Sequence, residues 1–432
     1  MSGNVNRGWT VTLAGTGVNL ALGLLYAWSI MAVYLRDNLG WTAMETQIPY
    51  MIACGVFALL MVPGGRIQDK IGPKAVIMAS GVFAGIGLIA SSFFMTVVGL
   101  SIFFGIFFGT AMGLGYASAT PPAIKWFSPK KRGMIAGIVV AGFGLAAIYA
   151  APAAEFMIAA YGISNTFLII GIAFFIVITL LAQLIRNPPP GYVPADMPVL
   201  DKSEQEAQKK KAVKVDFTWN EMVRTPRFYL IWLMFCFGSL SGLMIIGQLS
   251  GIAVEQAGVT LGFILVALLA GFNAGGRVAG GVLSDKLGRA NTLLFIFLLQ
   301  AVTFLLFGTF TSLVPLIIGT AIAGFCYGAF LAVFPATTAD FFGTKNLGVN
   351  YGLVFTSWGA GGVFGGLIGG MVRDTTGSYV MAYIIAASLC LIGAILSFFI
   401  RPKKQAEIDS PKELEVPAGS VPGAGECGKK AA

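Results

Sequence analysis

One arginine lies within an apolar stretch that is long enough to cross a membrane. The stretch from Leu261 to Gly281 is about the length that spans a hydrocarbon core of ~30 Å as a helix, and Arg277 is its one charged residue. Asn273 precedes it by one turn, so both side chains project from the same helix face. A guanidinium at membrane depth costs ~3 kcal/mol or more, and it persists where it faces a water-filled cavity or an anion. The pair therefore predicts a binding site for a carboxylate.

Anchoring is the alternative role for this arginine. Arg277 precedes Asp285 by eight residues, roughly 12 Å along a helix. Its long side chain can therefore also snorkel to the membrane surface. In that case the arginine would anchor the helix and bind no ligand.

The composition is that of a membrane protein that crosses the bilayer many times. Of the 432 residues, 56% are hydrophobic and 11% are charged, which excludes an ordinary soluble globular domain. The formal net charge of +9 comes from Lys and Arg that fall mostly in loops on one side, so no nucleic-acid partner is predicted. With no histidine and no CxxC among five cysteines, neither a metal site nor a disulfide framework is expected. No nucleophile or phosphate motif indicates an enzyme, and no cofactor is predicted.

Apolar runs of spanning length number twelve and form two groups of six. They cover residues 10–34, 45–65, 75–95, 97–122, 133–154 and 163–185, and then 228–250, 259–282, 290–308, 312–336, 350–371 and 378–400. We therefore expect an all-α membrane protein with six-helix bundles at 1–185 and 228–400. The linker at 186–227 is too polar to span and begins with prolines that end the sixth helix. The Gly- and Pro-rich tail at 401–432 is predicted to be disordered.

Basic residues in the loops predict the orientation. Loops after even-numbered spans hold most of the Lys and Arg, whereas those after odd-numbered spans hold only Arg36 and Arg373. Because Lys and Arg favour the cytoplasmic side, both termini and the linker are expected in the cytoplasm, with the spans in a bacterial cytoplasmic membrane. The KKK cluster of the linker can contact anionic membrane lipid, and a solvated linker is the alternative.

Spans two and eight end in the same short motif. The pattern G-x3-D-K-[IL]-G, closely followed by a basic residue, recurs 216 residues later and comprises Gly65, Asp69 and Gly72, and then Gly281, Asp285, Gly288 and Arg289. The two halves are thus related by a parallel repeat. Its glycines allow a tight cytoplasmic turn, and its aspartates can face a neighbouring helix N-terminus or local basic residues, as a gate would require. The counterpart of Arg277 in the first copy is Met61, so the scaffold needs no cation at this depth, which favours a ligand-binding role over anchoring.

With twelve spans, a long central linker and this duplicated motif, the chain resembles the major facilitator superfamily. The resemblance covers the chain up to its tail and implies two six-helix bundles with a central site that opens alternately to either side. The segments YAWSIMAVYLRDNLG, RTPRFY and NYGLVF, with the Asn273/Arg277 helix, resemble the branch of monocarboxylate transporters and oxalate:formate antiporters. They are similar to bacterial homologues of the lactate-type monocarboxylate transporters.

The resemblance also suggests which side chains surround the anion. Helices 1, 4, 7 and 10 line the cavity in this superfamily, so Tyr116 and Tyr327 can donate to a carboxylate or hydroxyl. Apolar walls are expected from Leu25, Tyr26, Phe355 and Trp358. Packing between helices is the alternative for each of them. One cation among mostly apolar walls suits a small organic monoanion.

Three positions depart from the family pattern. Many monocarboxylate transporters have an aspartate where this chain has Asn273 and a lysine where it has Ile30, so proton coupling through an Asp/Arg pair is not expected. Oxalate antiporters carry a second cation where this chain has Trp358, which disfavours a dianion.

The sequence therefore predicts a secondary transporter of small monocarboxylates such as lactate, coupled to a proton that neutralises the site with the anion. Asp69, Asp285 or a tyrosine would relay that proton. An anion exchanger of the oxalate:formate type is the chief alternative. A drug exporter or a non-transporting sensor, by contrast, would not depend on Arg277.

Overall fold

The computed structural model describes residues 2–128, 131–194, 216–258 and 262–400. Residues 195–215 of the linker, which include its KKK cluster, and the tail predicted to be disordered lie outside the described residues. The described part is helical and contains no strand.

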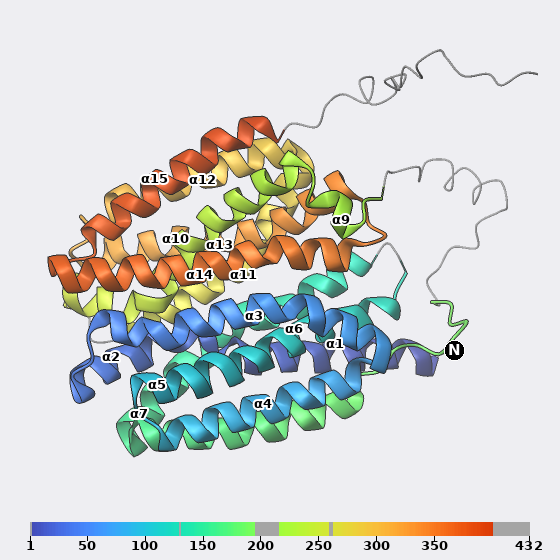
Figure 1. Cartoon of the computed structure of the whole chain (residues 1–432), viewed down its shortest axis with the longest axis horizontal. Coiled ribbons are helices and arrows are strands. Elements are labelled where there is room, and N and C mark those ends of the chain that lie inside the picture. The colour runs from blue at the N-terminus through green and yellow to red at the C-terminus, as the bar shows by residue number, and fades with distance from the viewer. Residues whose placement is uncertain (1, 129–130, 195–215, 259–261, 401–432) are drawn as a thin grey trace, which may run out of the picture. The chain divides into compact units, whose positions relative to one another are not determined.

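The N-terminal half forms one helical bundle, coloured blue to green in Figure 1. Its elements are α1 (Ser2–Leu22), a 3-10 turn (Gly23–Ala27), α2 (Trp28–Leu39), α3 (Ala43–Ile71), α4 (Pro73–Phe93), α5 (Val97–Leu100), a π-helical stretch (Ser101–Phe108), α6 (Gly109–Lys125) and α7 (Arg132–Leu184). The pieces α1 to α2 make one spanning segment, Arg7–Leu39, and α5 to α6 make another, Val97–Lys125.

Helix α7 is two spans joined by a break. With 53 residues it would measure about 80 Å if it were straight, far more than a bilayer core requires. Gly162 interrupts it with φ 76° and ψ 163°, a conformation that lies outside the helical region and that glycine tolerates because it has no Cβ. The break falls between the predicted spans 133–154 and 163–185. Eleven described helices are long and apolar enough to cross a membrane, and the break in α7 brings the number of crossing segments to the predicted twelve.

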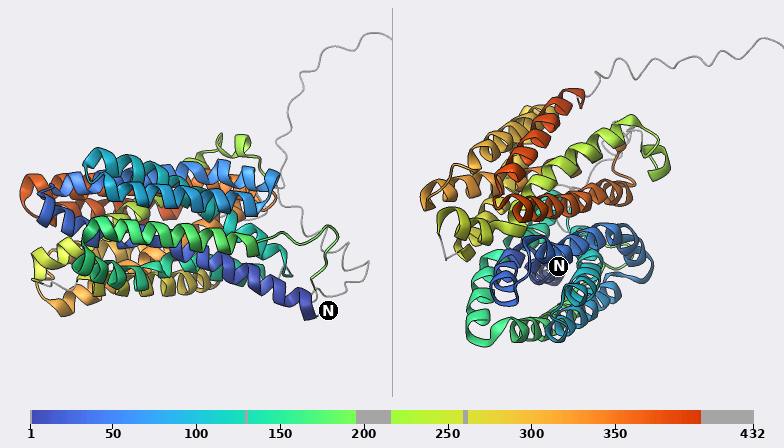
Figure 2. Two further views of the ribbon diagram at one scale, coloured as in Figure 1. Left: turned by 90° about the horizontal axis from the view of Figure 1, so that it is seen from below. Right: turned by 60° about the vertical axis from the view of Figure 1, so that its left-hand side comes forward.

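The C-terminal half forms the second bundle. It comprises α9 (Trp219–Met222), α10 (Pro226–Ala257), α11 (Gly262–Leu287), α12 (Arg289–Phe307), α13 (Leu313–Phe342), α14 (Leu347–Thr376), α15 (Val380–Leu396) and a 3-10 turn (Ser397–Phe399). Helix α14 packs along α3 and helix α11 packs along α7, so these two helix pairs join the bundles (Figure 2). At the first contact, a Cβ on Gly359 would lie 2.4 Å from the Ala58 Cβ, so only glycine lets α14 approach α3 this closely.

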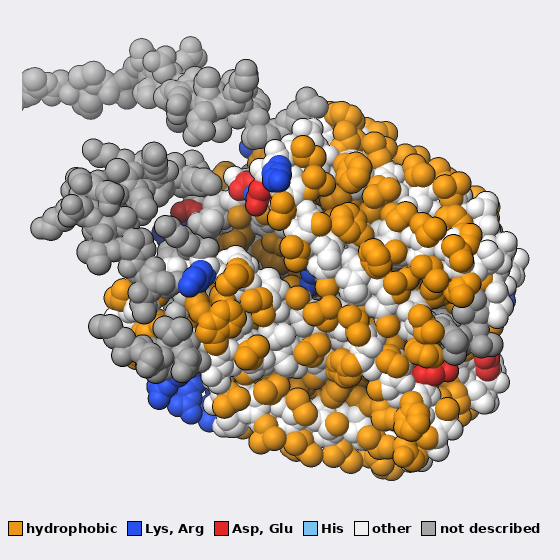
Figure 3. Space-filling model, turned by 180° about the vertical axis from the view of Figure 1, so that it is seen from behind, with side chains coloured by type: hydrophobic (Ala, Val, Ile, Leu, Met, Phe, Trp, Pro, Cys, Tyr) orange, Lys and Arg blue, Asp and Glu red, His pale blue; other side chains and the backbone are white. Residues whose placement is uncertain are grey.

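The surface supports insertion into a membrane. Figure 3 shows hydrophobic side chains covering the middle of one face, with Lys, Arg, Asp and Glu gathered toward its two ends. Large apolar side chains such as Leu59, Val278 and Phe156 are more than half exposed. Contiguous exposed apolar surface of this extent is incompatible with water and suits lipid.

Candidate functional site

The predicted Asn273/Arg277 pair is formed in α11. The Arg277 Nε donates to the Asn273 Oδ1 at 3.1 Å, and its Nη1 donates to the carbonyl oxygen of Val140 in α7 at 3.0 Å. Arg277 is half-buried, whereas Asn273 is fully buried. The guanidinium therefore points at the other bundle, and this contact argues against snorkelling toward the membrane surface.

The buried amide of Asn273 is only half used. Its oxygen accepts from Arg277, but its Nδ2 has no hydrogen-bond partner within the described part of the chain. A buried N–H2 without an acceptor costs about 1–3 kcal/mol unless a ligand or water satisfies it. Two hydrogen-bond donor groups, the Arg277 guanidinium and the Asn273 amide, are thus neighbours at this position.

Aromatic rings from both bundles surround this position. Phe57 in α3 lies 5.4 Å from Tyr116, 5.5 Å from Phe143, 5.6 Å from Phe355 and 5.0 Å from Trp358, measured between ring centroids. Of these five rings, those of Tyr116, Phe355 and Trp358 were predicted from the resemblance, while those of Phe57 and Phe143 were missed. A phenylalanine in an apolar span carries no sequence signal that distinguishes a cavity wall from ordinary packing.

Three buried side chains form a hydrogen-bonded chain at the same level. The Trp358 Nε1 donates to the Tyr327 hydroxyl at 2.7 Å, and the Tyr327 and Tyr26 hydroxyls lie 2.9 Å apart. The Tyr26 ring packs edge-to-face on Phe143 with centroids 5.2 Å apart, which connects the chain to the other rings. The predicted residues Tyr26, Tyr327 and Trp358 are therefore brought together.

Two further tyrosines accompany Arg277. Tyr116 and Tyr351 are both half-buried, and both interact electrostatically with the guanidinium. Tyr116 was predicted, whereas Tyr351, although part of the NYGLVF segment, was not singled out. Leu25 is fully buried in the 3-10 turn beside Tyr26 but takes no part in these ring contacts. We call the following residues the central cluster: Tyr26, Phe57, Tyr116, Phe143, Asn273, Arg277, Tyr327, Tyr351, Phe355 and Trp358.

The duplicated motif positions its glycines in two ways. Gly72 and Gly288 follow the last residues of α3 and α11 with φ 89° and 82°, and each forms the tight turn with a positive φ that glycine adopts because it has no Cβ. Gly65 and Gly281, by contrast, lie inside these helices, and a Cβ on either would meet nothing within 4 Å. The turn therefore depends on the last glycine of each copy, and the gate role of the motif stays a prediction.

The charged residues of the motif bond within their own bundle. Arg289 donates to Asp285 and to Asp340 at 2.8 Å each, which ties the end of α11 to α13. In the first copy, Asp69 accepts a bond from the neighbouring Gln68 at 3.3 Å. The Arg289 pairs thus brace the C-terminal bundle at the linker end, meaning the end at which residues 186–194 leave α7, whereas the Asp69 bond stays within α3.

An ion pair that joins the two bundles lies at the opposite end. Glu255 in α10 pairs with Arg36 in α2 and, at 2.5 Å, with Arg373 in α14. Beside them, the Asp374 carboxylate accepts from the first two backbone N–H groups of α3, those of Ala43 and Met44, at 2.8 Å each. A carboxylate at a helix N-terminus is favoured by the helix dipole. This group, which we call the opposite-end latch, holds α2 and α3 against α10 and α14.

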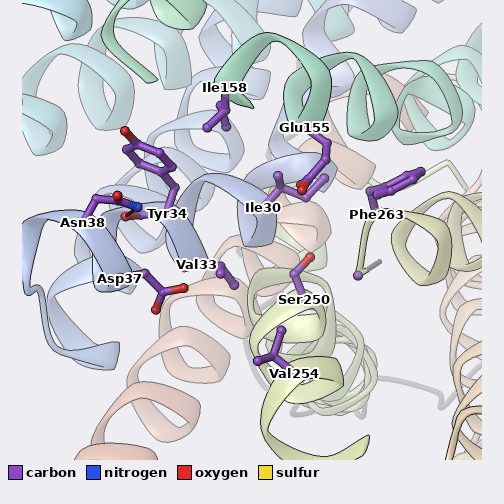
Figure 4. A pocket seen from close by; sticks show the side chains of 11 residues that line it. Ile30, Val33, Tyr34, Asp37, Asn38, Glu155, Ile158, Ser250, Val254 and Phe263 are labelled. Atoms are coloured by element: carbon purple, nitrogen blue, oxygen red, sulfur yellow. Dashed lines mark hydrogen bonds between the residues drawn. The ribbon is translucent and has the colours of Figure 1, made fainter. Parts of the chain in front are cut away.

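A cavity of about 210 Å³ lies near this latch and apart from the central cluster (Figure 4). Its lining includes Asp37 of α2, Glu155 of α7 and Ser250 of α10. Of these lining residues, Glu155 lies inside α7, two turns before Gly162, and it was not among the residues named from the sequence. It was missed because it follows the predicted span 133–154 by one residue.

Two membrane-spanning bundles that enclose a half-buried arginine define an integral membrane protein of the transporter class. The family model described as the Major Facilitator Superfamily matches residues 12–313 and 274–424. The chain belongs to the major facilitator superfamily, which confirms the family predicted from the duplicated motif.

Relatives from the predicted branch are also found. An oxalate:formate antiporter from Oxalobacter formigenes is 31% identical over 430 residues, which cover 95% of this chain and 96% of the antiporter. Monocarboxylate transporter 12 from Mus musculus is 23% identical over 369 residues, covering 79% of this chain and 74% of that protein. These relatives are transporters of small organic anions and not enzymes.

The fold is shared with a solved transporter structure. A bacterial homolog of the human lysosomal transporter Spinster, in an inward-facing and unoccupied conformation, matches with a TM-score of 0.63 and covers 92% of this chain and 96% of that one. At 18% sequence identity this likeness shows the fold alone.

Proposed function

We propose that the protein is a secondary transporter that carries a small monocarboxylate such as lactate between its two bundles. One observation carries the proposal: in the central cluster the Arg277 guanidinium lies beside the Nδ2 of Asn273, which has no hydrogen-bond partner among the residues that the structure describes. A carboxylate bound there would neutralise the cation and satisfy the amide. The surrounding rings would contact the apolar part of the substrate.

The charge of the cluster favours a monoanion. Arg277 is its one formally charged member, so a bound monoanion leaves the site neutral. A dianion would bring one unneutralised charge into a site surrounded by rings, at a cost of several kcal/mol. We therefore favour lactate-like substrates over oxalate.

Exchange of organic anions is the second candidate function. The relative from Oxalobacter formigenes, similar over nearly the whole chain, is an oxalate:formate antiporter. The two candidates differ in what drives uptake: a symporter follows a pH gradient, whereas an exchanger needs a counter-anion on the other side.

A proton is the coupling ion that we propose. The central cluster contains no carboxyl group, so the anion and the proton would neutralise the site together, with Asp69, Asp285 or a tyrosine as relay. We further propose that the membrane is the bacterial cytoplasmic membrane and that the linker end faces the cytoplasm, because the loops there carry most of the Lys and Arg.

Reconstitution into liposomes tests both candidates. Labelled lactate uptake is measured with an imposed inward proton gradient into empty vesicles, and separately at equal pH into vesicles loaded with lactate, formate or oxalate. Uptake that follows the proton gradient supports proton-coupled transport. Uptake that requires an internal anion identifies an exchanger, and the absence of any saturable carboxylate flux would refute the proposal.

A further inference from the structure

The Arg277 guanidinium is held on two sides, once by its own helix and once by the other bundle. The bonds to Asn273 Oδ1 and to the Val140 carbonyl use Nε and Nη1. A guanidinium has five N–H donors, so these two bonds leave three, all on Nη1 and Nη2. The end of the fork can still bind both oxygens of a carboxylate.

Gly144 lets the guanidinium reach α7. Side chains on a helix tilt toward its N-terminus, so a side chain at position 144 would cover the preceding turn, where the Val140 carbonyl lies. A Cβ built on Gly144 would lie 2.8 Å from the Asn273 Oδ1 and 3.3 Å from the Arg277 Cζ. Both distances are shorter than a relaxed contact, so even a methyl group would displace the cation or its amide partner.

We propose that Gly144 is a positioning residue for the transported anion. Because it has no side chain, Gly144 leaves room for the guanidinium between the Val140 carbonyl and Asn273. We call these two acceptors the seat, and they orient the guanidinium with its free donors toward the substrate. This inference rests on the proposed function, because the anion is the carboxylate that Arg277 is proposed to bind.

The seat also links substrate binding to the arrangement of the bundles. Val140 and Gly144 belong to the N-terminal bundle, and Arg277 belongs to the C-terminal bundle. The seat is therefore complete only while α7 and α11 are in contact. Movement of one bundle against the other would remove one acceptor from the guanidinium and change its orientation toward the anion.

Gly144→Ala tests the seat, with Gly137→Ala as its matched control. Gly137 lies two turns earlier in the same helix, and a Cβ there would meet nothing within 4 Å. Lactate binding to each purified full-length variant is measured by calorimetry. Gly144→Ala should weaken binding by roughly tenfold or more, because a cation misplaced by about 1 Å loses its alignment with the carboxylate. Gly137→Ala should bind as the unsubstituted protein does.

Lactate binding by the Arg277→Gln variant, measured in parallel, separates the seat from the proposed function. If Arg277→Gln abolishes lactate binding and Gly144→Ala leaves it unchanged, the seat is refuted while the proposed function stands. If Arg277→Gln itself still binds lactate normally, Arg277 is not the anion-binding group and the seat has no role. If the unsubstituted protein binds no lactate, the proposed function fails. If Gly144 has only a structural role, Gly144→Ala would lower the melting temperature, but the protein that still folds would bind lactate normally. That result would also refute the seat.

Thermal unfolding keeps the test decisive if Gly144→Ala folds poorly. The added Cβ would clash with atoms of Asn273 and Arg277. The loss of melting temperature caused by Gly144→Ala should therefore vanish when Asn273 and Arg277 are both replaced by alanine. Recovery of the melting temperature in that double-alanine background supports the contact. An equal loss in both backgrounds would overturn it.

Discussion

The hydroxyl groups of Tyr26 and Tyr327 lie 2.9 Å apart, although 301 positions separate the two residues in the chain. Tyr26 belongs to the N-terminal bundle and Tyr327 to α13 of the C-terminal one. The Tyr327 oxygen also accepts from the Trp358 Nε1. Because an indole N–H can only donate, Tyr327 is the middle member of a chain that joins the bundles within the central cluster.

Loss of the Tyr327 hydroxyl, in the middle of this chain, should lower the thermal stability more than loss of the Tyr26 hydroxyl at its end. Tyr327→Phe leaves both the Trp358 N–H and the Tyr26 hydroxyl without this partner, at a cost of about 1–3 kcal/mol for each buried group. Tyr26→Phe deprives at most one group. Thermal unfolding of both variants in detergent should therefore show the larger loss of melting temperature for Tyr327→Phe, and an equal loss would contradict the assigned chain.

Substitution of Arg277 should abolish substrate binding without unfolding the protein. Arg277→Gln removes the charge that binds the carboxylate and also a burial cost. Arg277→Lys should fail largely as well, because an ammonium cannot reach Asn273, the Val140 carbonyl and both oxygens of a carboxylate at once. Calorimetric titration with lactate measures binding, and gel filtration checks folding. Near-normal affinity in Arg277→Gln would restore the anchoring role.

A carboxylate at position 273 should make transport depend more steeply on pH. In Asn273→Asp, the ionised side chain would pair with Arg277 and compete with the substrate, whereas the protonated form would release the guanidinium. Transport by the variant should therefore rise as pH falls, more than in the unsubstituted protein. Lactate counterflow over a range of pH gives the profile. The same profile in both proteins would show that residue 273 does not act on Arg277 during transport.

The opposite-end latch should resist separation of the bundles at that end. Glu255→Gln leaves Arg36 and Arg373 without their shared carboxylate, so openings there should become more frequent. A cysteine placed at Ser250, which lines the cavity beside the latch, reports on this through its labelling rate in a chain without the native cysteines. Labelling should be faster with Glu255→Gln. Asp340→Asn, which breaks an ion pair inside one bundle at the linker end, is the control and should leave the rate unchanged.

The fold could be predicted because its signals are local. Runs of apolar residues define the spans, and the break at Gly162 falls between two of them. The pairing of Arg277 with Asn273 follows from their one-turn spacing in a helix. The rings that the resemblance named, such as Tyr327, could be predicted only through the family.

The rest of the site depends on contacts between segments that are far apart in the sequence, and no local pattern indicates these contacts. Phe57 and Phe143 join the central cluster only because α3 and α7 pack against the C-terminal bundle. The Val140 carbonyl that holds Arg277 has no side-chain signal at all. The ion pair of Glu255 with Arg36 likewise joins two segments that meet only where the bundles pack together.

The charge of the substrate should depend on the residue at position 358. Trp358 is 1% exposed, packs on Phe57 and Phe355 with centroids 5.0 Å away in each case, and donates to Tyr327. Trp358→Lys replaces this apolar wall by a cation within reach of the site. With two cations, a dianion would be neutralised, whereas a monoanion would leave one buried charge unpaired, at a cost of several kcal/mol. The variant should therefore bind lactate more weakly and oxalate better relative to lactate.

The ratio of oxalate to lactate inhibition constants in proteoliposomes measures this change. Trp358→Phe is the control, because it also removes the indole N–H but adds no charge, so it should leave the ratio near that of the unsubstituted protein. A ratio that does not change in a Trp358→Lys variant that still transports would place residue 358 outside the substrate's reach. It would also remove the charge argument for a monocarboxylate, since the missing second cation could then not be what excludes a dianion.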